Sequence, residues 1–167
     1  MIAWLAYAVL AVPLLFSVYF TPSHIAPQTF VMRLLVEAML FAYIALALSN
    51  SAYLPKFSAL SWSVIAFAGI YIVAGIFGLN PAQSFFSDLD WHWGFLTVAH
   101  LIVFFFILRG IMRDKEIWRR LFAVSVSASA LAAMYGVWQF FFTPEIGRIY
   151  STIGNPAALS SYVLLNA

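Results

Sequence analysis

The sequence predicts an all-α protein, a polytopic transmembrane helix bundle with about five complete spans and a truncated sixth. Of its 167 residues, 65% are hydrophobic and 8% are charged, whereas roughly 25% of the residues in an average soluble domain are charged. A helix that crosses a bilayer takes about 20 apolar residues, so this length accommodates five or six helices but no separate soluble domain. We therefore expect residues 1–167 to form a single transmembrane domain.

Apolar runs place the expected helices along the chain. The first run contains Pro13, which a membrane helix tolerates as a kink. This run has no basic start and is too long for a signal-peptide core, so we expect it to be retained as a helix. The expected helices cover residues 2–20, 30–48, 58–78, 94–109 and 121–142, with a sixth beginning near Ala157.

Each expected helix ends at a local helix breaker or at a cluster of charge. Proline removes a backbone donor and asparagine favours turns, so both interrupt a helical run. In chain order the boundaries are Thr21-Pro22, Ser49-Asn50, Asn80-Pro81, the charged run after Arg109, and Thr143-Pro144.

Basic residues indicate the orientation, because cytoplasmic loops retain Lys and Arg. The run RGIMRDKEIWRR, residues 109–120, holds five cations and is expected inside, which also places Lys56 and the amino terminus inside. The loops 79–93 and 143–156 are then outside. Besides anchoring the topology, the basic run could contact anionic lipid headgroups.

Several kinds of chemistry are not expected. The chain contains no cysteine, which excludes disulfides, thiolate catalysis and a Cys/His zinc cluster. We therefore expect no metal and no other cofactor, and no nucleic-acid partner.

The outer loop GLNPAQSFFSDLDWHWG combines aromatic residues with Asp88, Asp90 and His92. Aromatic rings gather at headgroup depth in many membrane proteins, so the loop could be part of an aromatic belt. Alternatively it lines a site for a lipid-linked substrate, with its acidic residues and histidine available for acid–base chemistry. Spacing alone does not choose between these interpretations.

Polar residues within the expected helices offer further candidates. Arg33 and Glu37 are four residues apart on one helical face, where we expect them to neutralise one another. The pair either fixes helix packing or contacts an anionic substrate. His100 and Gln139 are isolated and are expected to hydrogen-bond to neighbouring helices. Small residues are expected to allow close helix packing, namely Ser125, Ser127, Ser129, Ala132, Gly69, Gly75 and Gly78.

The stretch EIGRIYSTIGNP, residues 145–156, places Arg148 just before a Gly-Asn-Pro turn that leads into the last apolar run. A guanidinium offers paired donors to a phosphate, and a helix amino terminus adds unpaired N–H groups with a positive dipole end. Arg148 and Asn155 are therefore candidates for binding a diphosphate. The alternative is an ordinary loop arginine followed by an ordinary helix start.

Three stretches together resemble the amino-terminal part of the O-antigen ligase-like superfamily, which includes lipid-linked glycan ligases, O-antigen polymerases and protein O-oligosaccharyltransferases. They are FVMRLLVEAMLF, GLNPAQSFFSDLDWHWGFLTVAHLIVFFF and WQFFFTPEIGRIYSTIGNPAALSSYVLLNA. Their order and spacing agree with the family, and together they cover most of the chain from about residue 30 onward. Where the family often has Glu-Arg and an acidic residue before the loop glycine, this chain has Asp90-Trp91-His92-Trp93-Gly94, so the usual arginine is missing.

The resemblance implies a metal-independent, inverting transfer of a glycan from an undecaprenyl-diphosphate donor to a hydroxyl acceptor, outside the bacterial cytoplasmic membrane. The chain would be the amino-terminal portion of a protein with 10–12 helices, and the principal catalytic residues are expected beyond Ala167. The donor and membrane lipids are the expected partners; the acceptor is open. Substrate-binding candidates are Arg148, Asn155, Arg33, Glu37, Asp90 and His92. A different class, a small non-enzymatic membrane subunit or half of a transporter, is the alternative.

Overall fold

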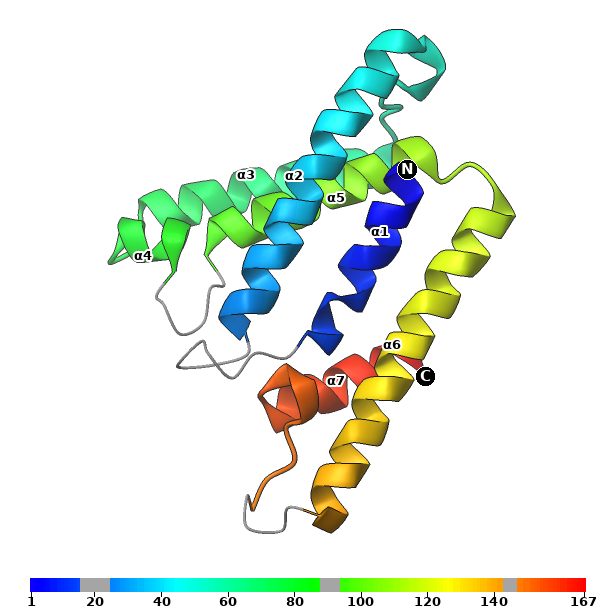
Figure 1. The fold of residues 1–167 in the computed structure, drawn as a ribbon. Helices are drawn as coiled ribbons and strands as arrows, with labels where there is room; N and C mark the ends of the chain where they lie inside the picture. The colour runs from blue at the N-terminus through cyan, green and yellow to red at the C-terminus, as the bar shows by residue number, and fades with distance from the viewer. Residues whose placement is uncertain (16–24, 88–93, 143–146) are drawn as a thin grey trace.

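The computed structural model describes residues 1–15, 25–87, 94–142 and 147–167, and every regular element in these ranges is helical (Figure 1). This confirms the predicted all-α class. The longer helices are α1 (Ile2–Ala11), α2 (Ile25–Ser49), α3 (Ala59–Ile76), α5 (Phe95–Ile111), α6 (Lys115–Phe142) and α7 (Pro156–Asn166). Shorter elements are the 3-10 turns η1 (Val12–Leu14), η2 (Ser51–Tyr53) and η4 (Ser151–Ile153), and the helix α4 (Pro81–Phe86).

Three helices of the described ranges are long and apolar enough to cross a membrane, over Ala26–Ser49, Ala59–Ile76 and Lys115–Phe142. The predicted number of five complete spans is therefore not confirmed. Ile2–Leu14 and Phe95–Ile111 are apolar but shorter; at 1.5 Å per residue, 17 residues reach about 25 Å, less than the roughly 30 Å of a hydrocarbon core.

The first predicted helix gives way to a 3-10 turn at Val12, with Pro13 next in the turn. A proline has no N–H for an α-helical hydrogen bond, so the tighter turn at this point has a local cause. The remainder of the predicted helix, from residue 16 to residue 20, lies outside the described residues.

Helix boundaries differ from expectation at two places. Helix α2 begins at Ile25, before the expected residue 30, and α6 begins at Lys115 rather than at residue 121. Residues 115–120 of the basic run consequently form the first turns of α6, and residues 109–111 form the end of α5. The short helix α4 was not predicted; Asn80 caps it by accepting a hydrogen bond from the Gln83 backbone N–H at 3.2 Å, a common helix start.

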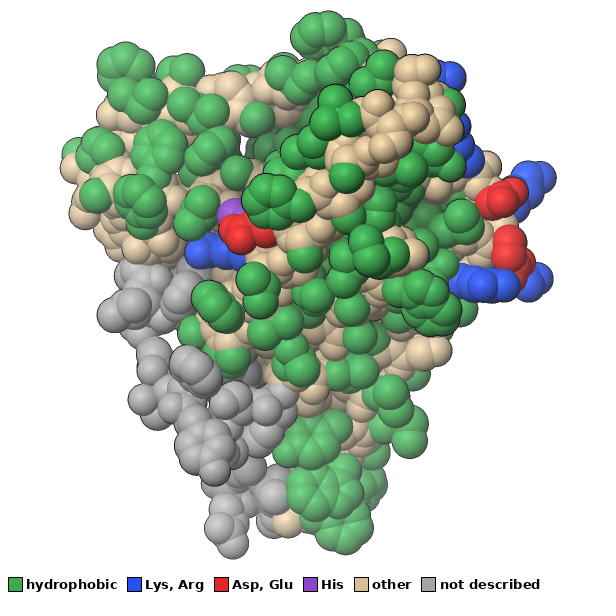
Figure 2. Space-filling model, turned by 45° about the horizontal axis from the view of Figure 1, so that its top comes forward, with side chains coloured by type: hydrophobic (Ala, Val, Ile, Leu, Met, Phe, Trp, Pro, Cys, Tyr) green, Lys and Arg blue, Asp and Glu red, His purple; other side chains and the backbone are tan. Residues whose placement is uncertain are grey.

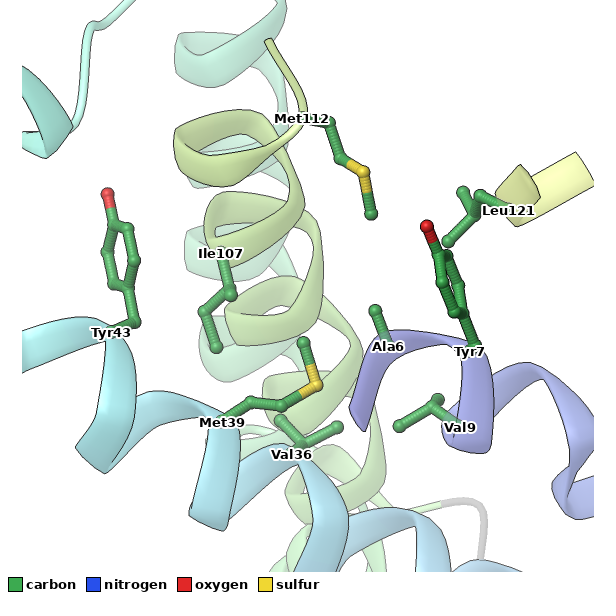
Figure 3. Close-up of a cluster of buried hydrophobic side chains, with 9 residues drawn as sticks. All are labelled: Ala6, Tyr7, Val9, Val36, Met39, Tyr43, Ile107, Met112 and Leu121. Atoms are coloured by element: carbon green, nitrogen blue, oxygen red, sulfur yellow. The ribbon is translucent and has the colours of Figure 1, made fainter. Parts of the chain in front are cut away.

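The core of the bundle lies where α1, α2, α5 and α6 meet (Figure 3). Ala6 and Met39 are 0% exposed, and Val36 and Ile107 are 1% exposed. Helix α3 packs outside this core against α5, and its Trp62, Phe67 and Ile70 side chains remain largely exposed. Figure 2 shows that apolar side chains cover most of the visible surface, which is the arrangement expected of helices that face lipid.

The helices run so that the molecule has two distinct ends (Figure 1). At the first, which we call the basic end, η2 lies beside the start of the α5–α6 connection, because the Arg113 guanidinium donates a hydrogen bond to the Ala52 carbonyl. At the other, which we call the Gln28 end, the Gln28 side chain bonds to the segment after α1 and to η4. Helix α7 lies against α6.

The small residues have mixed roles. Ser129 and Ala132 are buried in α6, and a Cβ at Gly75 would lie 3.2 Å from the Phe85 ring, so close packing is confirmed at these positions. Around Gly69, by contrast, a Cβ would meet nothing within 4 Å. The packing role predicted for Gly69 is therefore wrong, because this face of α3 points away from the other helices.

Candidate functional site

Arg148 lies in the segment that connects α6 to α7, on the surface of the protein. A hollow of about 450 Å³ is lined by Arg148, Ile149, Asn155, Pro156 and Ala157. We call it the Arg148 hollow. The structure thus brings together Arg148 and the start of α7, as the sequence predicts. An arginine beside a solvent-open hollow can offer its guanidinium to an anionic group there.

Asn155 acts as the amino-terminal cap of α7. Its Oδ1 accepts hydrogen bonds from the backbone N–H groups of Ala157 at 2.8 Å and Ala158 at 3.3 Å. These donors belong to the set that a helix start leaves without an intrahelical partner. An anion in the hollow would therefore compete with Asn155 for them, and Arg148 is the cation that lines the hollow.

The turn that carries Arg148 is anchored on α6 by Ser151, which is fully buried. The Ser151 backbone N–H donates to Gln139 Oε1 at 2.7 Å, and its hydroxyl donates to the Ala132 carbonyl at 2.5 Å. Gly136 permits this approach, because a Cβ there would lie 3.1 Å from the Ile149 side chain. Gln139 was expected to bond to a neighbouring helix; its partner here is the turn that precedes α7.

Gln28, near the start of α2, joins three separate segments at the same end of the molecule. Its Nε2 donates to the carbonyls of Pro13 at 3.2 Å, Leu15 at 3.0 Å and Thr152 at 2.8 Å. This single amide therefore links the end of α1 and the turn before α7 to α2. Gln28 was not among the sequence candidates, since a lone glutamine in a polar joint carries no distinctive pattern.

A second polar group lies between α2 and α5. The Arg33 guanidinium donates to the Thr97 hydroxyl, and Glu37 Oε1 lies 3.1 Å from His100 Nε2. The other ring nitrogen of His100, Nδ1, lies 2.7 Å from the Leu96 carbonyl. In Figure 2, basic, acidic and histidine side chains form a small group bordered by apolar side chains, apart from the charged side chains at the right edge of the view. We call these four residues, Arg33, Glu37, Thr97 and His100, the α2–α5 polar contact.

Arg33 and Glu37 were expected to neutralise one another. Their charges do interact, but the close contacts of both side chains go to α5 instead. The reason is geometric: α5 crosses α2 along this face and offers Thr97 and His100 directly opposite. The expectation that His100 bonds to a neighbouring helix is confirmed. Arg33 Nε is buried without a hydrogen-bond partner in the described part of the chain.

The remaining site candidates, Asp90 and His92, lie outside the described residues, as does Asp88. Within the described ranges, no three His, Asp or Glu side chains come close enough together to hold a metal ion.

Comparisons with protein-family models, curated proteins and solved structures gave no match.

Proposed function

We propose that this chain is the amino-terminal membrane portion of an O-antigen ligase-like glycosyltransferase, in which Arg148 holds the diphosphate of an undecaprenyl-diphosphate-linked glycan. The single observation that carries the proposal is the Arg148 hollow, with Arg148 directly beside the start of α7. In this proposal the protein lies in the bacterial cytoplasmic membrane, with its amino terminus inside and Arg148 outside.

The end of α6, the helix that precedes Arg148 in the sequence, supports a lipid-linked rather than a soluble anion. Helix α6 ends in Phe140, Phe141 and Phe142, whose side chains are 61%, 67% and 69% exposed. Exposed aromatic rings are common at the depth of the lipid headgroups. A substrate that carries its phosphates at that depth and its polyprenyl chain in the bilayer would meet a guanidinium and an apolar helix surface together.

In the proposed reaction, the role of this chain is to bind the diphosphate leaving group. An acceptor hydroxyl attacks the anomeric carbon, the bond from that carbon to the diphosphate oxygen breaks, and the hydroxyl proton passes to a base. Negative charge grows on the diphosphate as the bond breaks, and a fixed guanidinium stabilises it. The base and the other principal catalytic groups are expected beyond Ala167.

The α2–α5 polar contact has a supporting role in this proposal. Arg33 and Glu37 are engaged with Thr97 and His100, which favours a positioning role over direct contact with the donor. Asp90 and His92 remain candidates for the outer loop that follows α4.

The proposal is tested in the complete protein by replacing Arg148 with Ala and with Lys and measuring glycan transfer from an undecaprenyl-diphosphate donor. We expect the Ala variant to lose roughly 100-fold in transfer rate, a magnitude typical of one lost donor to a developing charge. The Lys variant keeps the charge without the planar fork and should retain part of the rate. Arg119→Ala removes an arginine whose side chain is 79% exposed and serves as the control. Transfer at the wild-type rate in Arg148→Ala would refute the assignment.

The Glu37–His100 pair supports a second candidate function, half of a transporter. Ionisable residues within membrane-spanning helices often mark an ion pathway, and Glu37 lies in α2, which is long enough to cross a membrane, with His100 facing it from the shorter α5. In proteoliposomes, proton-coupled flux that disappears in Glu37→Gln and His100→Ala would favour a transporter over a glycosyltransferase. Glycan transfer without such flux would exclude it.

A further inference from the structure

A second pocket lies at the basic end of the molecule, opposite the Gln28 end. Its volume is about 340 Å³, and Leu54, Lys56, Arg109, Gly110 and Arg113 line it. We call it the basic pocket. Its residues come from two parts of the chain that are distant in sequence. The connection between α2 and α3 supplies Leu54 and Lys56, and the end of α5 with the connection that follows it supplies Arg109, Gly110 and Arg113.

Tyr43 contacts both of these parts of the chain. Its hydroxyl donates to the Tyr53 carbonyl at 2.6 Å, and its ring packs on α5 so closely that a Cβ at Gly110 would lie 2.7 Å from the ring carbon Cζ. The Arg113 guanidinium lies 4.3 Å from the centroid of the Tyr53 ring. The pocket is thus built on fixed backbone rather than on two independent loops.

The two arginines are oriented by neutral partners. Arg109 Nη1 donates to the hydroxyl of Ser58, at 2.6 Å, and to that of Ser61. Arg113 donates through Nε to the Gly110 carbonyl at 3.3 Å and through Nη2 to Ala52. A guanidinium carries five N–H donors, so each arginine has donors left over after these bonds. A group that enters the pocket can use them.

Positive charge in the pocket is not balanced by its lining, in which no described residue is acidic. The nearby Glu116 is already paired with Arg119 at 2.8 Å and with Arg120 at 3.0 Å, and Asp114 is exposed beyond the lining. Three cations that converge without a carboxylate favour a bound anion, and arginines with free donors favour phosphate.

Exposed apolar side chains accompany the pocket: Leu54 lines it, and Phe57 and Leu60 follow Lys56 closely in the sequence. Leu54, Phe57 and Leu60 are 52%, 57% and 59% exposed, and Leu60 belongs to α3, which is long and apolar enough to cross a membrane. A phospholipid has a charged phosphate next to apolar acyl chains, and the cations and apolar side chains of this region offer a matching surface. Basic pockets between membrane helices bind anionic headgroups in this way.

We propose that the basic pocket binds the phosphodiester headgroup of an anionic glycerophospholipid. Arg109 and Arg113 hold the phosphate, Lys56 adds a third positive charge, and the acyl chains lie along Leu54, Phe57 and Leu60. This site is separate from the Arg148 hollow and does not depend on glycan transfer. It rests only on the location of the protein in a membrane.

The experiment counts lipids that stay bound to the purified complete protein by native mass spectrometry, after incubation with phosphatidylglycerol or with phosphatidylcholine. The test variant is Lys56→Gln, because the Lys56 side chain has no hydrogen bond or ion pair in the described part of the chain. Its matched control is Lys115→Gln, an exposed lysine in the first turn of α6 that does not line the pocket. Arg113→Lys tests whether planar donors are needed.

We expect phosphatidylglycerol to bind more tightly than phosphatidylcholine, and Lys56→Gln to weaken its binding about fivefold, the effect of one cation near an anionic lipid. Lys115→Gln should bind as the wild type does. Equal losses in the two lysine variants would mean that general surface charge attracts the lipid, which would overturn the proposal.

Inorganic phosphate distinguishes a lipid site from a site for a soluble anion. We expect excess phosphate to leave most of the phosphatidylglycerol bound. If phosphate alone displaces the lipid from the wild type, and Lys56→Gln abolishes that displacement, the pocket binds a soluble anion and the lipid proposal is wrong. Equal binding of the two lipids would also overturn it.

Discussion

Glu37 on α2 and His100 on α5 face each other across the helix interface, with 3.1 Å between Oε1 and Nε2. The histidine side chain is 14% exposed and the glutamate side chain 55% exposed, so the contact lies at the rim of the interface. Within the described ranges it is the carboxylate–histidine contact that links two helices, whereas the pairs of Glu116 lie within α6. Its neighbour, the hydrogen bond from Arg33 to Thr97, lies one turn closer to the Gln28 end.

The first prediction concerns the strength of this contact. Interhelical polar contacts in membrane proteins contribute about 0.6 kcal/mol on average and up to about 1.7 kcal/mol. We expect Glu37→Ala and His100→Ala to show a coupling energy in this range in a double-mutant cycle, measured by reversible unfolding of the protein in lipid or mild detergent.

Glu116 provides the control for this cycle, because its pairs with Arg119 and Arg120 lie on the exposed start of α6. Exposed pairs contribute little, so Glu116→Ala should leave the free energy of unfolding almost unchanged. A zero coupling energy between Glu37 and His100 would mean that the two helices are held together by apolar packing alone.

The second prediction concerns Gln28, whose amide donates to three carbonyls. Gln28→Glu keeps the shape of the side chain but replaces the donor with a carboxylate, which would face three acceptors. Each unsatisfied polar group away from water costs about 1–3 kcal/mol, so we expect marked destabilisation and faster hydrogen exchange at the Gln28 end. Hydrogen-exchange mass spectrometry would locate the change.

Gln83→Glu is the matched substitution for this test. Gln83 is exposed in α4, and its side-chain oxygen accepts from Asn80, which a carboxylate can also do. Hydrogen exchange in this variant should resemble that of the wild type. Similar behaviour of the two glutamate variants would contradict the role of Gln28 as a link between segments.

The third prediction separates capping from ligand binding at Asn155. Loss of a cap typically costs about 0.5–2 kcal/mol, so Asn155→Ala should lower stability by that amount and Asn155→Ser should largely restore it. Thermal unfolding in detergent measures both. If Asn155→Ala leaves the stability unchanged but abolishes donor binding, Asn155 contacts the donor directly rather than through α7.

The fourth prediction compares two glycines within helices. A Cβ at Gly110 would lie 2.7 Å from Tyr43 Cζ, whereas at Gly69 it would meet nothing within 4 Å. Overpacking costs about 1–3 kcal/mol, so Gly110→Ala should destabilise the protein and disturb the basic pocket. Gly69→Ala should be neutral or stabilising by up to about 1 kcal/mol, since alanine is the better helix former.

The measured free energies of unfolding of Gly110→Ala and Gly69→Ala test this prediction. Equal values would show that Tyr43 moves aside freely, which would contradict its role in holding the two connections of the basic end together.

Parts of the candidate site could be predicted from the sequence. The Gly-Asn-Pro stretch predicts a helix start, and Asn155 does cap α7. Arg148 indeed lines a hollow with that helix start. The short connection from Arg148 through η4 to Pro156 keeps the arginine close to the start of α7. The expectation of unpaired N–H groups at this helix start is wrong for Ala157 and Ala158, because the Asn155 side chain accepts a hydrogen bond from each of them.

The sequence by itself determined that the chain is helical and apolar, and approximately where its helices begin and end. These properties depend on neighbouring residues: long apolar runs, prolines without an N–H, and asparagines that cap. Only the tertiary structure decided which polar groups meet. Arg33 bonds to Thr97, 64 positions away in the sequence, and Glu37 contacts His100, 63 positions away. Gln28 bonds to Thr152, 124 positions away. Such contacts depend on the angles at which helices cross and on the side chains that each crossing brings together.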